Sequence, residues 1–573
     1  MYTSQENVRI VIAALKKYGI RKCVLSPGGT NIPVVQALQQ DDFFTCYSVY
    51  DERSAIYFAI GLYLQTGEPI ATSCTSAQAT RNYVPGLTEA YYKHVPIIAI
   101  TTSKLERYDY QDYMQAPDQC SLPKDSVKRS FDLPPVTDEN TRVTCQQYVI
   151  NGILEALHGN PGPVQINLRM TDGMLKSFED IELPTIKYVK RYMAWDDWSD
   201  VNLENKKILL VIGEHRTFTQ RQIESINRFC NAFNVAVYTN HFSNFSNDFS
   251  IHGNLIVDGG GMNYLQPDII ITIGGQTGDY PLFGAISKLL GVELWRVSED
   301  GNYVDTYCLL TKIFECPDFF FFEKLEIAKV EQDHSYFLSW KKEYDKLSYD
   351  IDLPLSNLYV AQQLSKKIPE GSIMNFAILN SIRCWNYFPL HSSIQCYGNI
   401  AAFGIDGCNS MLIGESIETD NLSFIVTGDL AFFYDMNALG IRHIKPNVRV
   451  LLINNGLGVE FKLLTTGIEK IAPIEQYIAA KGHNASAKGW AESCGFSYLS
   501  AATKDELKAV EDQFVLPSDK PILLEVFTKP EDETKAISLL KSKNRFTTST
   551  TKKMIKEFVG VENIEKVKNI FRK

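Results

Sequence analysis

The sequence lacks a long apolar run. A membrane-spanning helix needs about eighteen or more consecutive apolar residues, yet the most apolar stretch, residues 424–441, is interrupted by Asp429, Asp435 and Asn437. Residues 1–19 show an amphipathic pattern with scattered charges, without the basic start, apolar run and small residues of a signal peptide. These absences predict a cytoplasmic protein that does not enter a membrane.

An excess of basic residues is missing too. The chain has 57 Lys and Arg against 67 Asp and Glu, a formal net charge of −10, which argues against a partner with a phosphate backbone. Its 12 cysteines form no CxxC pair, so we expect reduced thiols, several of them in the core. The composition therefore favours chemistry on small molecules over nucleic-acid binding.

Short β-branched runs alternate with helical patterns along the 573 residues. The runs include CVLS, PIIAITT, KILLVIG, DIIITIG, ELWRVS, FIVTGD, VRVLLIN and PILLEVF. Such alternation predicts an α/β protein made of doubly wound parallel sheets, and the chain is too long for one core. Charged stretches divide the pattern into three domains, at residues 1–185, 190–345 and 355–540, and a polar tail at 541–573 with a helix near 550–571.

Two strand ends carry side chains that suit a divalent metal. Asp429 follows the apolar run 424–427, and Asn455 follows the next apolar strand. The carboxyl ends of strands in a doubly wound sheet face the ligand crevice, and Mg²⁺ prefers oxygen ligands in the company of phosphates. We expect Asp429, Asn455 and a backbone carbonyl, that of Leu457 or of Gly456 with Leu457 favoured, to hold Mg²⁺ beside a diphosphate.

The Gly428-Asp429 block and the Asn-Asn pair are each typical of a turn when taken alone. Together they resemble the signature of thiamine-diphosphate-dependent enzymes. By this resemblance, residues 1–185 are the pyrimidine-binding domain, residues 190–345 the central domain and residues 355–540 the diphosphate-binding domain. It implies thiamine diphosphate and Mg²⁺ as cofactors. The cofactor-binding residues expected from it are Pro27, Gly28, Thr75, Ser76, Gly404, Ile405, Asp406, Gly428, Asp429, Leu430, Ala431, Asn455, Leu457 and Gly458.

Glu52 stands in the first turn of a predicted helix that is apolar almost all round and is therefore expected to be buried. A first-turn carboxylate is often no more than a partner of the helix dipole. The surrounding sequence, from SPGGTN to PIIAITT, looks like the pyrimidine-binding domain of this superfamily. By that resemblance Glu52 is the catalytic carboxylate that activates the cofactor through its pyrimidine ring.

The segment Tyr397–Gly407 and the block GDLAFFYDMNALG resemble the SEPHCHC synthases of the menaquinone pathway, which join a decarboxylated 2-oxoglutarate to isochorismate. That family implies that Ile405 is an apolar wedge under the cofactor. The chain departs from the pattern where family arginines meet substrate carboxylates, with Thr30, Ile400 and Trp385 in their places. Residues expected near the substrate are Thr30, Lys104, Gln115 and Arg383.

We therefore expect decarboxylation of a 2-oxo acid followed by transfer to an acceptor, on a substrate pair that differs from that of the family. SEPHCHC synthase itself, an acetolactate-synthase-like or simple decarboxylase, and a non-catalytic scaffold remain as alternatives. No GxGxxG follows a strand, which argues against flavin. Possible proton donors are His94, His391 and His483. The superfamily also implies a homodimer, or a dimer of dimers, that shares its sites between subunits.

Overall fold

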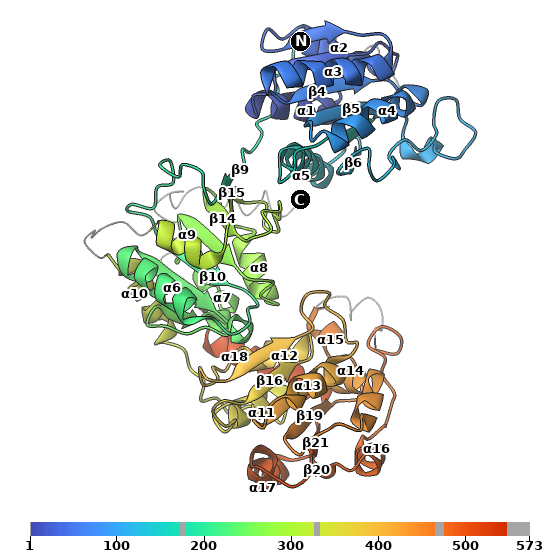
Figure 1. Cartoon of the computed structure of the whole chain (residues 1–573). Helices are drawn as coiled ribbons and strands as arrows, with labels where there is room; N and C mark the ends of the chain where they lie inside the picture. Colours follow the sequence, from blue (N-terminus) through green and yellow to red (C-terminus); the bar gives the residue numbers. More distant parts are fainter. Residues whose placement is uncertain (1, 172–177, 326–332, 465–474, 547–573) are drawn as a thin grey trace, which may run out of the picture. The chain divides into compact units, whose positions relative to one another are not determined.

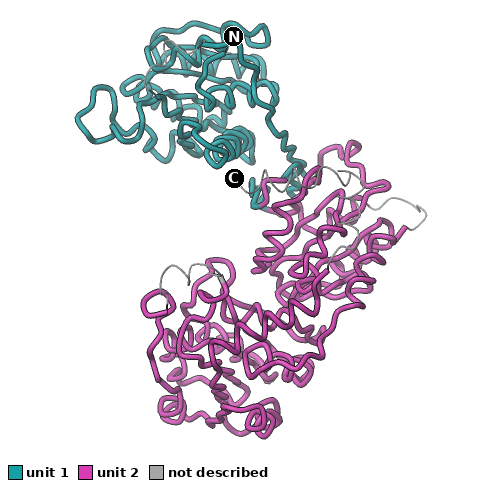
Figure 2. The backbone as a smooth tube through the Cα atoms, turned by 180° about the vertical axis from the view of Figure 1, so that it is seen from behind, with its two compact units in different colours: residues 1–193, 300–306, 310–315 teal, residues 194–299, 307–309, 316–573 magenta. Residues whose placement is uncertain are grey.

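The computed structural model describes residues 2–171, 178–325, 333–464 and 475–546. The chain forms two compact units (Figure 2). Unit 1 contains residues 1–193, 300–306 and 310–315, and unit 2 contains residues 194–299, 307–309 and 316–573. The predicted helix at 550–571 lies outside the described residues, and the predicted domain boundaries stay predictions.

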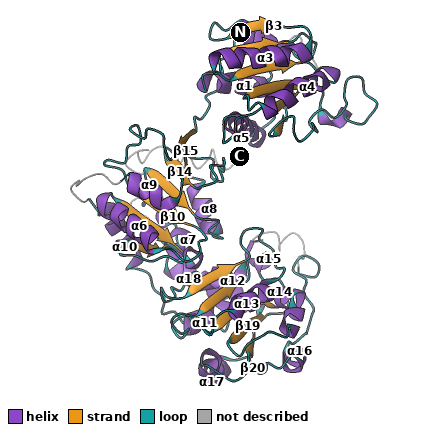
Figure 3. Cartoon of the chain, in the orientation of Figure 1, coloured by secondary structure: helices purple, strands orange, loops and turns teal. Residues whose placement is uncertain are grey.

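Unit 1 is built on a six-stranded parallel sheet in the order β3-β2-β4-β5-β7-β6, flanked by helices (Figures 1 and 3). Its strands are β2 (Lys22–Leu25), β3 (Thr45–Ser48), β4 (Ile70–Cys74), β5 (Ile97–Ser103), β6 (Ser130–Leu133) and β7 (Val164–Arg169). Its helices are α1 (Glu6–Lys17), α2 (Ile32–Gln39), α3 (Glu52–Thr66), α4 (Gln78–Tyr92) and α5 (Glu139–Ala156). Two short pairs complete it, β1 (Tyr2–Thr3) with β8 (Phe178–Glu179) and β9 (Lys190–Met193) with β15 (Leu310–Glu315).

Unit 2 begins with five parallel strands in the order β12-β11-β10-β13-β14. These strands are β10 (Ile208–Ile212), β11 (Val235–Thr239), β12 (Ser250–His252), β13 (Ile269–Ile273) and β14 (Glu293–Val297). The helices of this part are α6 (Gln220–Ala232), α7 (Asn254–Asp258), α8 (Tyr280–Ile286), α9 (Asp318–Lys324) and α10 (Ser335–Tyr344).

The second sheet of unit 2 has six parallel strands in the order β17-β16-β18-β19-β21-β20. These strands are β16 (Ile373–Phe376), β17 (Gln395–Gly398), β18 (Ser423–Gly428), β19 (Val448–Asn454), β20 (Ser497–Ala501) and β21 (Ile522–Phe527). The helices are α11 (Asn357–Leu364), α12 (Asn380–Trp385), α13 (Cys408–Ile417), α14 (Asp429–Tyr434), α15 (Glu460–Leu464), α16 (Lys488–Ser493), α17 (Lys504–Val515) and α18 (Pro530–Lys543).

The sheet of unit 1 and this second sheet have the same topology. Counting strands along the chain within each sheet, both run second, first, third, fourth, sixth, fifth. In this order the first strand lies beside the third and the chain reverses direction across the sheet, which creates a crevice at the carboxyl ends of the strands. The predicted doubly wound α/β class is confirmed, and the two sheets place their ligand-facing loops in corresponding positions.

Burial on both faces explains why the predicted runs become strands. Every residue of β4, β5 and β19 is buried, as expected for parallel strands covered by helices. All eight runs predicted from the sequence are strands. Cys23, Cys74 and Cys384 are buried thiols whose pKa values burial raises. Within the described ranges, no helix combines the length and apolarity needed to cross a membrane.

Helix α3 differs from its prediction. Its residues Ala55, Ile56, Ala59 and Ile60 are buried in unit 1, but Tyr57, Phe58 and Leu64 are exposed by 47%, 42% and 67%. The helix is therefore only half buried by its own chain. The expectation of a fully buried helix was wrong, because the sheet and α4 cover one stripe of α3 and leave the opposite apolar stripe open.

A buried arginine connects the second sheet of unit 2 to helix α17 by hydrogen bonds. Arg449, on β19, is 0% exposed and donates to the carbonyls of Phe514 at 2.8 Å, Pro446 at 2.7 Å and Leu516 at 2.6 Å. Two of these acceptors lie at the C-terminal end of α17. Burial lowers the pKa of Arg449 to about 10, which still leaves the side chain charged at neutral pH.

Replacing this arginine should destabilise unit 2. Arg449→Met keeps much of the volume but leaves several buried carbonyls without a donor, which costs about 1–3 kcal/mol for each unsatisfied group. We expect a lower denaturation midpoint in a urea titration followed by circular dichroism. Lys508→Met, at an exposed position of the same helix α17, is the control, and an equal midpoint for the two variants would contradict the assigned role.

Candidate functional site

Asp429 joins the ends of two strands. It follows β18 directly, begins α14 and is 2% exposed. Its Oδ1 accepts from the N–H of Leu430 at 2.8 Å, and its Oδ2 accepts from the N–H groups of Asn455 at 3.2 Å and Gly456 at 2.7 Å. The two strand ends predicted to form a site are thus brought together by one carboxylate.

Burial and the neighbouring groups have opposite effects on the pKa of Asp429. Burial raises the pKa of its carboxyl, while the backbone N–H groups of Leu430 and Gly456 and the nearby His483 act to lower it. The Nε2 of His483 lies 3.1 Å from Oδ2, and the ring packs edge-on against Phe433 with centroids 5.5 Å apart. The Nδ1 of His483 is buried and has no hydrogen-bond partner within the described ranges.

The loop after β19 is shaped by glycines. Gly456 has a φ of +76°, a conformation that side chains disfavour. A Cβ added to Gly458 would lie 3.1 Å from the Phe461 ring. Leu457 is buried, and its N–H donates to Oδ1 of Asn455 at 3.3 Å. The loop therefore lies close against its neighbours, with Asn455 half-buried beside Asp429.

These groups fit Mg²⁺ with a diphosphate. Among the residues that the structure describes, Oδ1 of Asp429 accepts one hydrogen bond, which leaves acceptor capacity for a cation. The described residues contain no group of three His, Cys, Asp or Glu side chains that could hold a metal. A site here would hence rely on one carboxylate, an amide oxygen and a carbonyl, with phosphate and water as further ligands, which suits Mg²⁺ better than zinc.

The segment before α13 forms a second part of the predicted cofactor seat. Ile405 is half-buried and packs against the core that contains Cys408 and Leu412. A Cβ on Gly404 would lie 2.5 Å from Oδ2 of Asp406, and Asn399 donates to the carbonyl of Asp406 at 2.5 Å. The turn is thus fixed by its own contacts, with Ile405 only partly covered.

In unit 1, Glu52 is the first residue of α3, as predicted. Asp51 caps the helix by accepting from the N–H of Ser54 at 2.9 Å. The Glu52 carboxylate is half-buried, and its Oε2 accepts from Asn82 of α4 at 3.4 Å. One weak contact leaves most of its acceptor capacity open to a ligand.

The loop containing Pro27 and Gly28 packs against the end of β4. A Cβ on Gly28 would lie 2.2 Å from Cβ of Thr75, so only glycine fits there. Thr30 is 4% exposed, and its hydroxyl contacts the hydroxyls of Thr75 and Thr102 at 2.8 Å each and accepts from the N–H of Ser76 at 3.1 Å. Its hydrogen-bonding capacity is filled by these neighbours, and its place near the substrate stays a prediction.

The other predicted substrate residues of unit 1 differ in exposure. Lys104 is half-buried, and Gln115 is exposed with a φ of +59°. Gln119, which sequence reasoning missed, is buried and bonds the N–H of Ala77 at 2.9 Å and the carbonyl of Thr102 at 3.1 Å. No pattern in the sequence marks Gln119, because its partners are distant in the chain.

Arg383 forms an ion pair with a carboxylate of unit 2. Its guanidinium, on α12, forms a two-pronged ion pair with Glu460 of α15, one contact of which measures 2.6 Å. Glu460 is 4% exposed. Burial disfavours the charged guanidinium, but the carboxylate outweighs this and raises the pKa of Arg383. The charge of Arg383 is therefore compensated within unit 2, and its place near the substrate stays a prediction.

The histidines considered as proton donors are separated by the fold. His94 is exposed in the turn after α4, and His391 is half-exposed, with Nδ1 2.8 Å from the hydroxyl of Ser393. His483 alone among the three contacts a predicted cofactor residue. No local pattern in the sequence distinguishes these three histidines.

Comparison with known proteins places this chain in a family. Residues 6–122 match the family model of the thiamine pyrophosphate enzymes, N-terminal TPP binding domain. A 2-succinyl-5-enolpyruvyl-6-hydroxy-3-cyclohexene-1-carboxylate synthase of Phocaeicola vulgatus is 33% identical over 93% of this chain and 97% of its own length. Enzymes of the same name from Bacteroides thetaiotaomicron and Flavobacterium psychrophilum are 32% and 29% identical over 94% and 90% of this chain, and 98% and 95% of their own lengths.

The Asp429 centre can be tested by the cofactor's effect on stability. Because a ligand that binds only the folded state raises its stability, thiamine diphosphate with Mg²⁺ should raise the thermal unfolding midpoint of the natural protein. Asp429→Ala should abolish that increase. Asp420→Ala, at a fully exposed carboxylate, is the control, and an unchanged cofactor dissociation constant in Asp429→Ala would refute the assignment.

Proposed function

We propose, from the premise that this chain belongs to the SEPHCHC synthase family of thiamine diphosphate enzymes, that it decarboxylates a 2-oxo acid and transfers the remaining acyl group to an acceptor other than isochorismate. The observation that carries the second part concerns three positions. Thr30, Ile400 and Trp385, which stand where the family pattern has arginines, are 4%, 0% and 0% exposed. None of them can supply a cation to a substrate carboxylate.

Each predicted residue has a task in this proposal. Asp429, Asn455 and the carbonyl of Leu457 hold Mg²⁺, and the glycines beside them admit the diphosphate. Glu52 holds a proton against the pyrimidine nitrogen, and its weak contact with Asn82 leaves it available for this. When bound, thiamine diphosphate supplies the carbon nucleophile and the electron sink for loss of CO₂. The three predicted domains take the pyrimidine-binding, central and diphosphate-binding roles in chain order, in the cytoplasm.

We further propose that two chains share each site, with Glu52 from one and Asp429 from the other. The open apolar stripe of α3 supports this, because Tyr57, Phe58 and Leu64 are exposed on the helix that begins with Glu52. An apolar stripe of this kind is typical of a surface that another protein covers. A second copy of the chain, in a homodimer or a dimer of dimers, is the partner.

Mixed dimers test this arrangement. Glu52→Gln and Asp429→Ala homodimers should both be inactive. A verified heterodimer of the two variants should keep about one intact site of two, and so about half the activity of the natural dimer. The measurement is CO₂ release from purified, differently tagged heterodimers. A complete lack of activity there would place both residues of a site in one chain.

The substrate is tested by direct assay with 2-oxoglutarate and isochorismate. A missing charge-assisted contact costs about 1.5–3 kcal/mol, so two or three losses should lower kcat/KM by several orders of magnitude. An authentic SEPHCHC synthase is the positive control, and CO₂ release from a panel of 2-oxo acids identifies the donor. Efficient synthesis, with kcat/KM of about 10⁴ M⁻¹s⁻¹ or more, would assign the chain to the menaquinone pathway instead.

A further inference from the structure

A fully buried carboxylate on β21 lies close to the predicted Mg²⁺ site without being one of its ligands. Glu525 is 0% exposed and lies opposite Leu452 of the neighbouring strand β19. Two residues further along the same pair of strands, Asn454 ends β19, and the predicted ligand Asn455 follows it. Since burying a carboxylate is costly unless hydrogen bonds or a cation compensate it, the partners of Glu525 indicate what this side chain does.

Four neutral groups donate to this carboxylate. Its Oε1 accepts from Nδ2 of Asn454 at 2.7 Å, and its Oε2 accepts from the hydroxyls of Ser486 at 2.7 Å and Tyr498 at 2.8 Å. The N–H of Ala487 lies within 3.3 Å of Oε1 and 3.1 Å of Oε2. The donors belong to the end of β19, to the segment before α16 and to β20. A carboxylate can serve them all because both of its oxygens accept hydrogen bonds, whereas a neutral amide has a single acceptor oxygen.

On one side, Glu525 orients the end of β19. Asn454 is 6% exposed, and its Nδ2 also donates to the carbonyl of Ala485 at 2.9 Å. The N–H of the next residue, Asn455, donates to Oδ2 of Asp429 at 3.2 Å. Because the peptide group that joins Asn454 to Asn455 is planar, fixing the Asn454 side chain restricts where the Asn455 backbone can lie.

On the other side, Glu525 holds the segment that carries His483. Nε2 of His483 lies 3.1 Å from Oδ2 of Asp429, and Ser486, three residues later in the sequence, donates to Glu525. The same oxygen of Asp429 accepts from the loop after β19. Both chain segments that contact this oxygen therefore lie within a few residues of a donor to Glu525.

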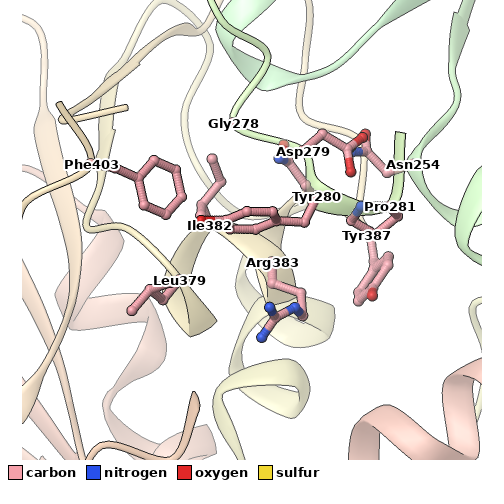
Figure 4. Close-up of a pocket in the computed structure, with 11 residues that line it drawn as sticks. Asn254, Gly278, Asp279, Tyr280, Pro281, Leu379, Ile382, Arg383, Tyr387 and Phe403 are labelled. Carbon is pink, nitrogen blue, oxygen red and sulfur yellow. The ribbon is translucent and has the colours of Figure 1, made fainter. Parts of the chain in front are cut away.

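A second carboxylate holds the far end of the loop after β19. Glu460 is 4% exposed and pairs with Arg383, which lines a small pocket together with Tyr280 (Figure 4). The volume of this pocket is about 30 Å³, which is room for about one or two water molecules. The loop with the predicted Mg²⁺ ligands is thus held at both ends, and the carboxylate before it, Glu525, also connects it to the segment of His483.

We propose that Glu525 is a positioning residue for Mg²⁺, which holds Asn454 and residues 483–487 so that Asn455 and Asp429 keep the spacing that the ion requires. This inference rests on the proposed function, in which Asp429 and Asn455 hold Mg²⁺. The ion demands near-ideal octahedral geometry, so a small displacement of one ligand weakens binding. Loss of a residue that orients a metal ligand typically lowers metal affinity by about 10–100-fold.

The test replaces the carboxylate by its neutral amide. Glu525→Gln keeps the size of the side chain but offers a single acceptor oxygen, so the contacts on at least one side are lost. Mg²⁺ is titrated calorimetrically into cofactor-free protein at a fixed concentration of thiamine diphosphate. We expect the Kd for Mg²⁺ to rise by about tenfold or more. Glu492→Gln, at an exposed position on α16, is the matched control, and an equal Kd in the two variants would overturn the inference.

Two further measurements separate positioning from a role in folding alone. The urea midpoint of the cofactor-free protein reports stability. The electron paramagnetic resonance spectrum of bound Mn²⁺, an ion that takes the same oxygen ligands, reports their geometry. We expect Glu525→Gln to change this spectrum at saturating Mn²⁺. A lower urea midpoint combined with the natural Kd for Mg²⁺ and the natural Mn²⁺ spectrum would overturn the inference.

A second variant is used if Glu525→Gln does not fold. Ser486→Ala/Tyr498→Phe keeps the carboxylate and its contact with Asn454 but removes two hydroxyl donors. The Kd for Mg²⁺ should again rise, by about threefold or more. An unchanged Kd in this folded double variant would overturn the inference.

Failure of the proposed function is distinguishable from failure of this inference. The natural protein is titrated first with Mg²⁺ and thiamine diphosphate. No binding there would refute the proposed function and the inference with it. Binding by the natural protein, with the same Kd in Glu525→Gln, would overturn the inference alone and leave the proposed function intact.

Discussion

The carboxylate of Asp429 is the constraint on which the candidate site depends. A buried carboxylate is tolerated only when hydrogen bonds or a cation compensate it. Here the N–H groups of Leu430, Asn455 and Gly456 do so. Because the last two belong to the loop after β19, the position of that loop is fixed by the end of β18. The predicted metal ligands are therefore held by backbone geometry as well as by their own side chains.

A second compensated pair lies close to the loop after β19. Glu460 is the first residue of α15, only a few residues beyond Gly456. Its ion pair with Arg383 connects the segment after β19 to α12. A buried ion pair contributes little net stability, but breaking it leaves one uncompensated charge. Its more important consequence here concerns recognition, because a guanidinium that faces a carboxylate attracts a second anion weakly. The local charge is therefore set by pairing and not by the number of cationic residues.

The two six-stranded sheets have matching topologies. Each sheet presents loops at the carboxyl ends of its strands, one set carrying Glu52 and its neighbours, the other carrying Asp429 and Asn455. Helix α3 connects this arrangement to assembly, since its apolar residues exceed what unit 1 can cover. This open apolar stripe is the observation on which the proposed homodimer rests.

The sequence by itself determined the α/β class, the strands and the pairing of Asp429 with Asn455. These follow from local patterns, namely apolar runs of strand length and polar residues at their ends, which parallel sheets bring to one edge. It also placed Glu52 in the first turn of its helix, because helix starts have local signals. The family resemblance rested on the same short segments.

Only the tertiary structure decided how the charges and polar groups are used. Thr30 and Arg383 form hydrogen bonds with Thr102 and Glu460, which are 72 and 77 residues away in the chain. The same holds for the contact of His483 with Asp429 and for the exposure of α3. Hydrogen bonds and burial between distant segments depend on how strands are ordered and helices packed. No local pattern contains that information, so these contacts became visible only in three dimensions.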